Sequence, residues 1–146
     1  MVGVGSVGLR AWIVLLESGL EADMLLLQAK QAEVSVLADY SGDSEYTNQG
    51  ERVVVGQHLM QASSDIFLGW LRAQPTGGGD QDYYVRQLRD WKVSAIIEEM
   101  DHRSMDVYAQ LCGWTLARAH ARSGDRIAIS AYLGNSTKFD LSLIHI

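Results

Sequence analysis

Three glycines near the start of the chain restrict its fold more than any other feature of the sequence. Gly3, Gly5 and Gly8 have the spacing Gly-x-Gly-x-x-Gly, which forms phosphate-binding loops in several unrelated folds. The residues that follow, 9–16, are rich in β-branched and aromatic side chains and predict a strand. The glycines therefore lead into a strand and not into a helix.

The surroundings of these glycines exclude two common phosphate-binding loops. A dinucleotide-binding loop opens a helix whose N-terminus holds the pyrophosphate, and a P-loop ends in Gly-Lys followed by Ser or Thr. Neither pattern follows Gly8. What remains is a glycine-rich turn between two strands of a hairpin, which protein kinases fold over the phosphates of ATP, or an ordinary turn that needs glycine for its backbone freedom.

The next part of the chain predicts two pairs of strands with a helix between them. A nearly continuous apolar run at 24–29 predicts a strand that is buried on both faces and pairs with 9–16 as a hairpin. A helix is expected at 50–65. The turn at 73–81, which holds the single proline, separates two further strands at 65–72 and 82–90. These elements predict an antiparallel sheet with one helix.

The C-terminal part predicts helices. A short helix is expected at 91–100 and a long one at 104–124, with Ser104 as its N-cap and Gly124 as its end. One stripe of the long helix is apolar and is expected to be buried, including the single cysteine: Met105, Tyr108, Cys112, Leu116 and Ala119.

Two residues meet the further demands of a kinase-type small lobe. Such a lobe needs a lysine on the next strand for the α and β phosphates of ATP and a helix acid that pairs with this lysine. Lys30 ends the second predicted strand, and Glu51 lies in the first turn of the first predicted helix. The alternatives are that Lys30 is a charge on an edge strand and that Glu51 only favours the helix dipole.

The motifs together resemble a bacterial family without an established activity, domain of unknown function 2252 (DUF2252). The resemblance spans nearly the whole chain and rests on VGVGSVG (2–8), LLLQAK (25–30), GERVVVGQHLMQASSDIFLGW (50–70), YVRQLRDWK (84–92) and CGWTLARAHARSGD (112–125). The family is distantly similar to protein kinases and aminoglycoside phosphotransferases. The resemblance implies an α+β, kinase-like small lobe, followed by helices of a truncated large lobe.

The chain departs from the kinase pattern where the chemistry takes place. No catalytic Asp follows the His-Arg of residues 102–103, and Phe139-Asp140 is followed by Leu141 instead of glycine. The resemblance implies that the corresponding motifs precede Met1 in a longer parent protein. We therefore expect residues 1–140 to be a fragment of one kinase-like domain without a catalytic residue of its own. Residues 141–146 are expected to be a non-native tail.

Composition narrows the partners and the compartment. The chain has 146 residues and a net charge of −6, which excludes a nucleic-acid partner held by a basic face. It contains no long apolar segment of the kind that spans a membrane. A single cysteine, Cys112, suits a reducing compartment. We expect a cytoplasmic protein that binds neither nucleic acid nor membrane, and no metal site formed by its histidines.

These observations predict a nucleotide-binding part of a phosphotransferase whose acceptor is unknown. ATP with Mg²⁺ is the expected cofactor in the parent protein, although the fragment alone is expected to be inactive. The residues expected to bind the nucleotide are Gly3, Gly5, Ser6, Gly8, Lys30 and Glu51 at the phosphates and Gln87, Leu88 and Arg89 at the adenine. The alternatives are a non-catalytic, kinase-like binding or regulatory module and an interaction protein in which the glycines are turns.

Overall fold

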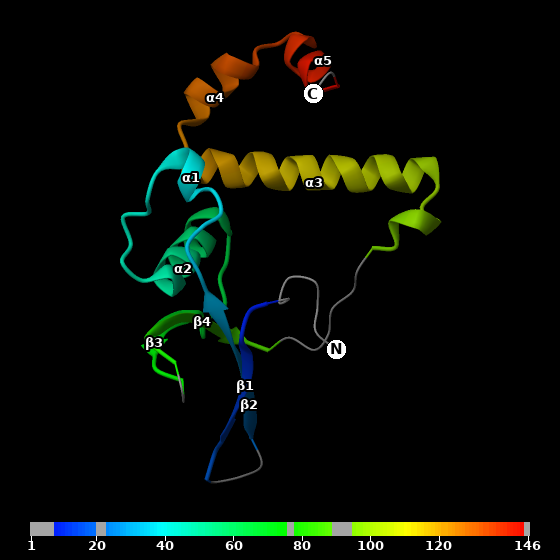
Figure 1. Ribbon diagram of the computed structural model, residues 1–146. Helices are drawn as coiled ribbons and strands as arrows, with labels where there is room; N and C mark the ends of the chain where they lie inside the picture. Colours follow the sequence, from blue (N-terminus) through cyan, green and yellow to red (C-terminus); the bar gives the residue numbers. More distant parts are fainter. Residues whose placement is uncertain (1–7, 20–22, 76–77, 89–94, 145–146) are drawn as a thin grey trace. The chain divides into compact units, whose positions relative to one another are not determined.

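The structure of the protein is a computed structural model that describes residues 8–19, 23–75, 78–88 and 95–144. The chain divides into two compact units, residues 1–93 and residues 94–146 (Figure 1). In the described residues, the first unit contains an antiparallel sheet with helices and the second unit is helical. The class is α+β, as the sequence predicts.

Four antiparallel strands form the sheet of the first unit. β1 (Ala11–Glu17) and β2 (Met24–Ala32) form one hairpin, and β3 (Gly69–Ala73) and β4 (Gln81–Gln87) form another. The strand order is β1-β2-β4-β3, so both predicted hairpins are confirmed. Because β2 lies between β1 and β4, the interpretation of Lys30 as an edge charge is wrong.

The burial of β2 is weaker than its apolar run predicts. Ala29 is buried, but Met24 is 65% exposed and Leu26 is 41% exposed. The helix that covers one face of the sheet packs mainly against β3 and β4 and less against β2. The beginning of β2, at Met24 and Leu26, is therefore open to solvent in the first unit.

The helix α2 (Gln49–Met60) lies against the sheet (Figure 1). It begins within one residue of the predicted start and ends five residues before the predicted end. Gly50 and Val54, one turn apart, face the sheet and are buried. A Cβ atom on Gly50 would lie 2.7 Å from the carbonyl carbon of Tyr83 and even closer to its oxygen. Glycine therefore allows the backbone of α2 to approach β4. A single turn, α1 (Ala38–Ser41), precedes α2.

The second unit contains α3 (His102–Ser123), α4 (Arg126–Leu133) and α5 (Lys138–Ile144) (Figure 1). α3 matches the long predicted helix and ends before Gly124 as expected. Of the short helix predicted at 91–100, the structure shows a 3-10 turn at Ile97–Glu99, and residues 91–94 lie outside the described residues.

The N-cap of α3 is Asp101 and not Ser104, so the sequence prediction is wrong by three residues. The Asp101 carboxylate accepts a hydrogen bond from the backbone N–H of Ser104 at 2.7 Å. The hydroxyl and the backbone N–H of Ser104 together lower the pKa of Asp101. An aspartate accepts a helix-start N–H at least as well as a serine does, and its charge also favours the helix dipole.

The predicted apolar stripe of α3 is mostly exposed within the second unit. Ala119 is buried there and Tyr108 is half-buried, whereas Leu116 is 56% exposed. Cys112 is exposed, and the expectation of a buried thiol is wrong. An apolar stripe is buried only where a neighbouring element covers it, and α4 contacts α3 over a short stretch. In the described part of the chain, no helix is both long and apolar enough to cross a membrane.

Candidate functional site

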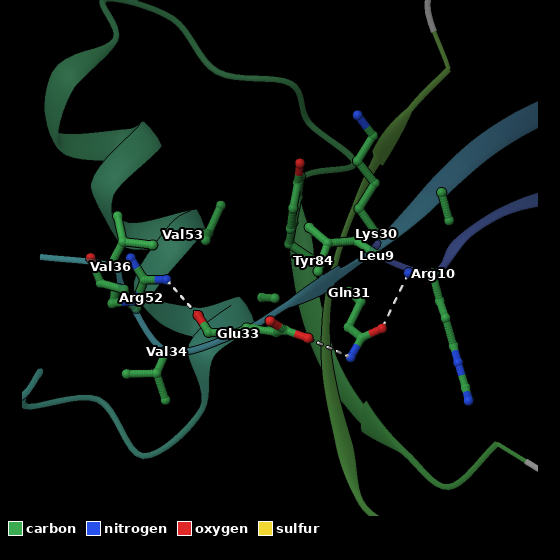
Figure 2. Close-up of a pocket in the computed structure, with 13 residues that line it drawn as sticks. Leu9, Arg10, Lys30, Gln31, Glu33, Val34, Val36, Arg52, Val53 and Tyr84 are labelled. Atoms are coloured by element: carbon green, nitrogen blue, oxygen red, sulfur yellow. Dashed lines mark hydrogen bonds between the residues drawn. The ribbon is translucent and has the colours of Figure 1, made fainter. Parts of the chain in front are cut away.

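A cavity of about 380 Å³ lies between the sheet and α2 in the first unit (Figure 2). It is formed by the start of β1, the end of β2, the segment after β2, the second turn of α2 and the middle of β4. The lining residues are Leu9, Arg10, Ala11, Lys30, Gln31, Ala32, Glu33, Val34, Ser35, Val36, Arg52, Val53 and Tyr84. The cavity thus collects residues from four stretches of the chain that are distant in sequence: 9–11, 30–36, 52–53 and 84.

Lys30 and Tyr84 form one wall of this cavity. They are directly opposite each other in the register of β2 and β4, so both side chains lie on the same face of the sheet. Both residues are half-buried, and Figure 2 shows their polar ends pointing in the same direction. An ammonium group and a phenol hydroxyl placed in this way both donate hydrogen bonds and suit an anionic oxygen.

Short polar contacts fix the segment that follows β2. The guanidinium of Arg52 donates to the backbone carbonyl of Glu33 at 3.0 Å and to the Gln49 side-chain oxygen at 2.8 Å. The Gln31 side chain accepts from the backbone N–H of Arg10 at 3.2 Å and donates to the Glu33 carboxylate at 3.3 Å (Figure 2). These bonds connect β1, β2 and α2 around the cavity.

The first turn of α2 is anchored on β4 by Asp82. The Asp82 carboxylate accepts from the backbone N–H of Gln49 at 2.8 Å and forms an ion pair with Arg72 at 2.7 Å. The pKa of Asp82 is lowered, mainly by the hydrogen bond from Arg72. The partial burial of Asp82 acts in the opposite direction. Asp82 therefore holds α2 at the height where Arg52 and Val53 reach the cavity.

The structure does not bring Lys30 and Glu51 together. Glu51 is absent from the lining of the cavity, and the ion pair that occurs among the described residues is Arg72–Asp82. The backbone N–H of Glu51 donates to the capping oxygen of Asn48 at 3.1 Å. Burial, a hydrogen bond with Glu45 and the charges of Glu45 and Glu51 raise the pKa of Tyr46.

The remaining predicted nucleotide ligands are placed only in part. Gly8 has φ +80°, a backbone conformation that favours glycine, and it directly precedes the cavity residue Leu9. The backbone N–H of Gln87 donates to the Asp65 carboxylate at 2.6 Å, and that of Leu88 donates to the Leu26 carbonyl at 2.9 Å. Neither Gln87 nor Leu88 lines the cavity. The predicted residues Gly3, Gly5, Ser6 and Arg89 lie outside the described residues.

The part of the chain that the structure describes contains no group of three or more His, Cys, Asp or Glu side chains able to hold a metal ion. The imidazole of His58 is hydrogen bonded to the hydroxyl of Ser64 at 2.7 Å. The side chains of the described residues therefore do not form a carboxylate-rich site of the kind that holds Mg²⁺.

Sequence reasoning missed Tyr84, Arg52 and Asp82. The position of Tyr84 opposite Lys30 follows from strand register, which a sequence pattern does not reveal when the two strands are separated by two helices and a third strand. The start of α2 did carry a signal, because Asn48 stands three residues before Glu51, the spacing of a capping motif.

Comparison with known proteins gives one clear relationship. Neither the curated proteins nor the solved structures contain a significant match to this chain. A family of bacterial proteins does match, described as "Uncharacterized protein conserved in bacteria (DUF2252)", over residues 1–146. The chain therefore belongs to the DUF2252 family.

Proposed function

We propose that the chain is the ATP-binding part of a kinase-like phosphotransferase, with Lys30 as the residue that binds the phosphates. The observation that carries this proposal is the position of Lys30 in the cavity beside Leu9 and Arg10, the residues that directly follow the glycine segment. The order of glycine segment, strand lysine, helix and second hairpin is the order of a kinase small lobe.

The cavity has the size and chemistry of a small-molecule site. Its volume of about 380 Å³ lies within the usual range of such sites. Three basic residues and one acidic residue line it, which favours an anionic ligand. Leu9, Val36 and Val53 supply apolar surface for an uncharged part of the ligand.

The proposed role of each residue follows from its surroundings. The Lys30 ammonium contacts phosphate oxygens, and the Tyr84 hydroxyl donates a hydrogen bond beside it. Arg52 already donates to Glu33 and Gln49, so it holds the wall of the cavity. We assign Glu51 no ion pair with Lys30 in this arrangement. Because the described residues do not form a Mg²⁺ site, we propose nucleotide binding for them and no metal-dependent step.

The alternative is a non-catalytic, kinase-like module. Two observations favour it: Lys30 has no acidic partner of the kinase type, and the described residues lack a carboxylate cluster for a metal ion. Such a module would still bind an anion at Lys30 without turning over ATP. The two functions therefore share a binding site and differ in turnover.

We further propose that the partners of this site are a nucleotide and a small acceptor in the cytoplasm. A net charge of −6 disfavours nucleic acid as the anionic partner. The exposed thiol of Cys112 suits a reducing compartment.

Calorimetric titration of the full-length protein with Mg-ATP tests the proposal. Lys30→Met should weaken ATP binding about tenfold or more, because it removes a charge-assisted contact from a half-buried site. Lys138→Met is the matched control, since this lysine lies in the second unit, and it should leave binding unchanged. Adenosine should bind to the wild type more weakly than ATP does. Its affinity should be the same for the wild type and for Lys30→Met, because adenosine has no phosphates.

Two results would overturn the proposal. Absence of Mg-ATP binding by the folded wild type removes the nucleotide site. Equal binding by the wild type and Lys30→Met removes the lysine mechanism. If ATP binds as expected but a coupled assay detects no phosphate release with a panel of acceptors, the non-catalytic module becomes the better account.

A further inference from the structure

The side chain of Gln31 joins the segment before β1 to β2. The backbone N–H of Gln31 donates to the carbonyl of Arg10 at 2.8 Å, as in a regular antiparallel ladder. In such a pair the Arg10 N–H would donate to the Gln31 carbonyl, but it donates instead to the side-chain oxygen of Gln31 at 3.2 Å (Figure 2). Gln31 therefore replaces one backbone bond of the hairpin with a side-chain bond.

This replacement occurs where the chain separates from β2. β1 begins one residue later, at Ala11, which lies opposite Lys30. An amide side chain reaches further than a carbonyl, so it keeps the Arg10 N–H hydrogen bonded while the two backbones diverge. Leu9 and Arg10 line the cavity, and Gly8 before them has φ +80°. The bond thus holds the backbone that leads from the glycine segment into the cavity.

Gln31 acts on the cavity through this backbone. Because Gln31 follows Lys30 in β2, their side chains lie on opposite faces of the sheet, and Figure 2 shows them pointing in opposite directions. The oxygen of the Gln31 amide accepts from Arg10, and its nitrogen donates to the Glu33 carboxylate at 3.3 Å. A ligand beside Lys30 would therefore meet Leu9 and Arg10 and not the Gln31 amide.

Glu33 connects this arrangement to α2. Its carboxylate accepts from Gln31, and its backbone carbonyl accepts from the Arg52 guanidinium at 3.0 Å. The segment before β1 and the helix α2 are therefore held by bonds that meet at one residue.

We propose that Gln31 is a positioning residue of the nucleotide site, which holds the backbone of Leu9 and Arg10 at the place where phosphates bind beside Lys30. This inference rests on the proposed function. A segment that is already held loses less conformational freedom when a ligand binds, so the bond to Arg10 raises the affinity for the phosphates without touching them. It should not alter the affinity for a ligand without phosphates.

Calorimetric titration of the full-length protein tests this role. Gln31→Met keeps the length of the side chain and removes both of its hydrogen bonds. The affinity for Mg-ATP should fall about fivefold, the equivalent of one hydrogen bond, whereas the affinity for adenosine should not change. Gln28→Met is the matched control, because Gln28 is a half-buried glutamine of the same strand that does not line the cavity. It should leave both affinities unchanged.

Glu33→Ala separates the two bonds of Gln31. It removes the acceptor of the amide nitrogen and leaves the bond to Arg10 in place. Because it also removes an acidic charge from the cavity, the affinity for Mg-ATP should stay the same or rise. Hydrogen exchange of the Arg10 amide in the ligand-free protein reports on the bond itself. Exchange should be faster in Gln31→Met and unchanged in Gln28→Met and Glu33→Ala.

The results separate this inference from the proposed function. If Lys30→Met weakens Mg-ATP binding but a folded Gln31→Met does not, the positioning role is wrong and the proposed function stands. Absence of Mg-ATP binding by the folded wild type removes both. Equal losses of ATP and adenosine affinity, or unchanged exchange at Arg10, would also overturn the positioning role. Should Gln31→Met fail to fold, Gln31→Asn takes its place, because it keeps the amide and is one methylene shorter.

Discussion

The helices α2 and α3 are held in place in different ways. α2 is tied to distant segments: the N–H of Gln49 donates to Asp82, the backbone at Gly50 approaches Tyr83, and Arg52 donates to the carbonyl of Glu33. The bonds of α3 that the structure shows join residues close in sequence. Asp101 caps Ser104, Asp106 accepts from Gln110 at 2.8 Å, and the Arg118 guanidinium lies 4.6 Å from the Trp114 ring centre.

The two helices show that the formation of a helix and its position in the fold have different causes. Local bonds decide that α3 is a helix and where it ends, but they do not fix its place against other elements. The contacts of α2 fix its height on the sheet and therefore the shape of the cavity beside Lys30. Substitutions at the anchors of α2 should lower the stability of the whole first unit, whereas equivalent substitutions in α3 should act on that helix alone.

The largest effect is expected for Gly50→Ala. The new Cβ atom would overlap the backbone carbonyl of Tyr83 and lie 3.0 Å from the Asn48 side-chain oxygen. The Tyr83 carbonyl is backbone and cannot swing aside, so α2 must move away from β4, at a cost of roughly 2–3 kcal/mol. Urea unfolding followed by fluorescence measures the change in free energy.

Gly56→Ala provides the control on the same helix. No atom lies within 4 Å of a Cβ at Gly56, so alanine should stabilise α2 by about 0.5–1 kcal/mol through helix propensity. If both substitutions stabilise the protein, α2 does not pack on β4 as closely as described.

A smaller effect is expected for Asp82→Asn. The amide removes the charge that pairs with Arg72 and weakens the bond to the N–H of Gln49, at a cost of about 1–2 kcal/mol at pH 7. The pKa of Asp82 is lowered in the folded state, so its contribution is present above the ordinary aspartate pKa of about 3.9 and is lost as the pH falls through the lower folded value.

The stability difference between the wild type and Asp82→Asn should therefore be full at pH 7 and shrink below about pH 4. Asp106→Asn in α3 is the matched control, because its carboxylate accepts from Gln110 within one exposed helix. It should leave the stability at pH 7 unchanged. A constant difference across the acid range would show that Asp82 acts through shape and not through charge.

The sequence predicts the four strands and the helices α2 and α3 because each has a local cause, whereas α1, α4 and α5 were not predicted. β1 and β2 are β-branched and apolar runs, the single proline separates β3 from β4, and Gly124 ends α3. Burial was predicted less well. The stripe of α3 that contains Cys112 has helical periodicity, but periodicity shows only which side of a helix is apolar and not which element covers it.

In the candidate site, too, some residues could be predicted from the sequence and others could not. Lys30 could be selected from sequence because it ends an apolar strand in a chain with three lysines. Its neighbours Tyr84 and Arg52 could not, because they reach the cavity through strand register and through the height of α2. The predicted partner Glu51 lies on the correct helix but does not line the cavity, since its position around the helix depends on anchors such as Asp82.

The smallest effects should come from the two helix caps, and they sharpen the comparison most directly because the same bond is removed in each case. Asn48→Ala removes the acceptor for the N–H of Glu51, and Asp101→Ala removes the acceptor for the N–H of Ser104. Asn48 is 4% exposed, so its loss also disturbs packed surroundings, and we expect the first unit to lose about 1 kcal/mol.

Asp101 is exposed, and its loss should fray the first turn of α3 without changing the first unit. Amide hydrogen exchange resolved by residue separates these outcomes. Asn48→Ala should accelerate exchange in α2 and also in β4, which α2 contacts through Asp82. Asp101→Ala should accelerate exchange only in the first turns of α3. Faster exchange throughout both units in either variant would contradict the distinction between a helix positioned by distant segments and a helix held by its own sequence.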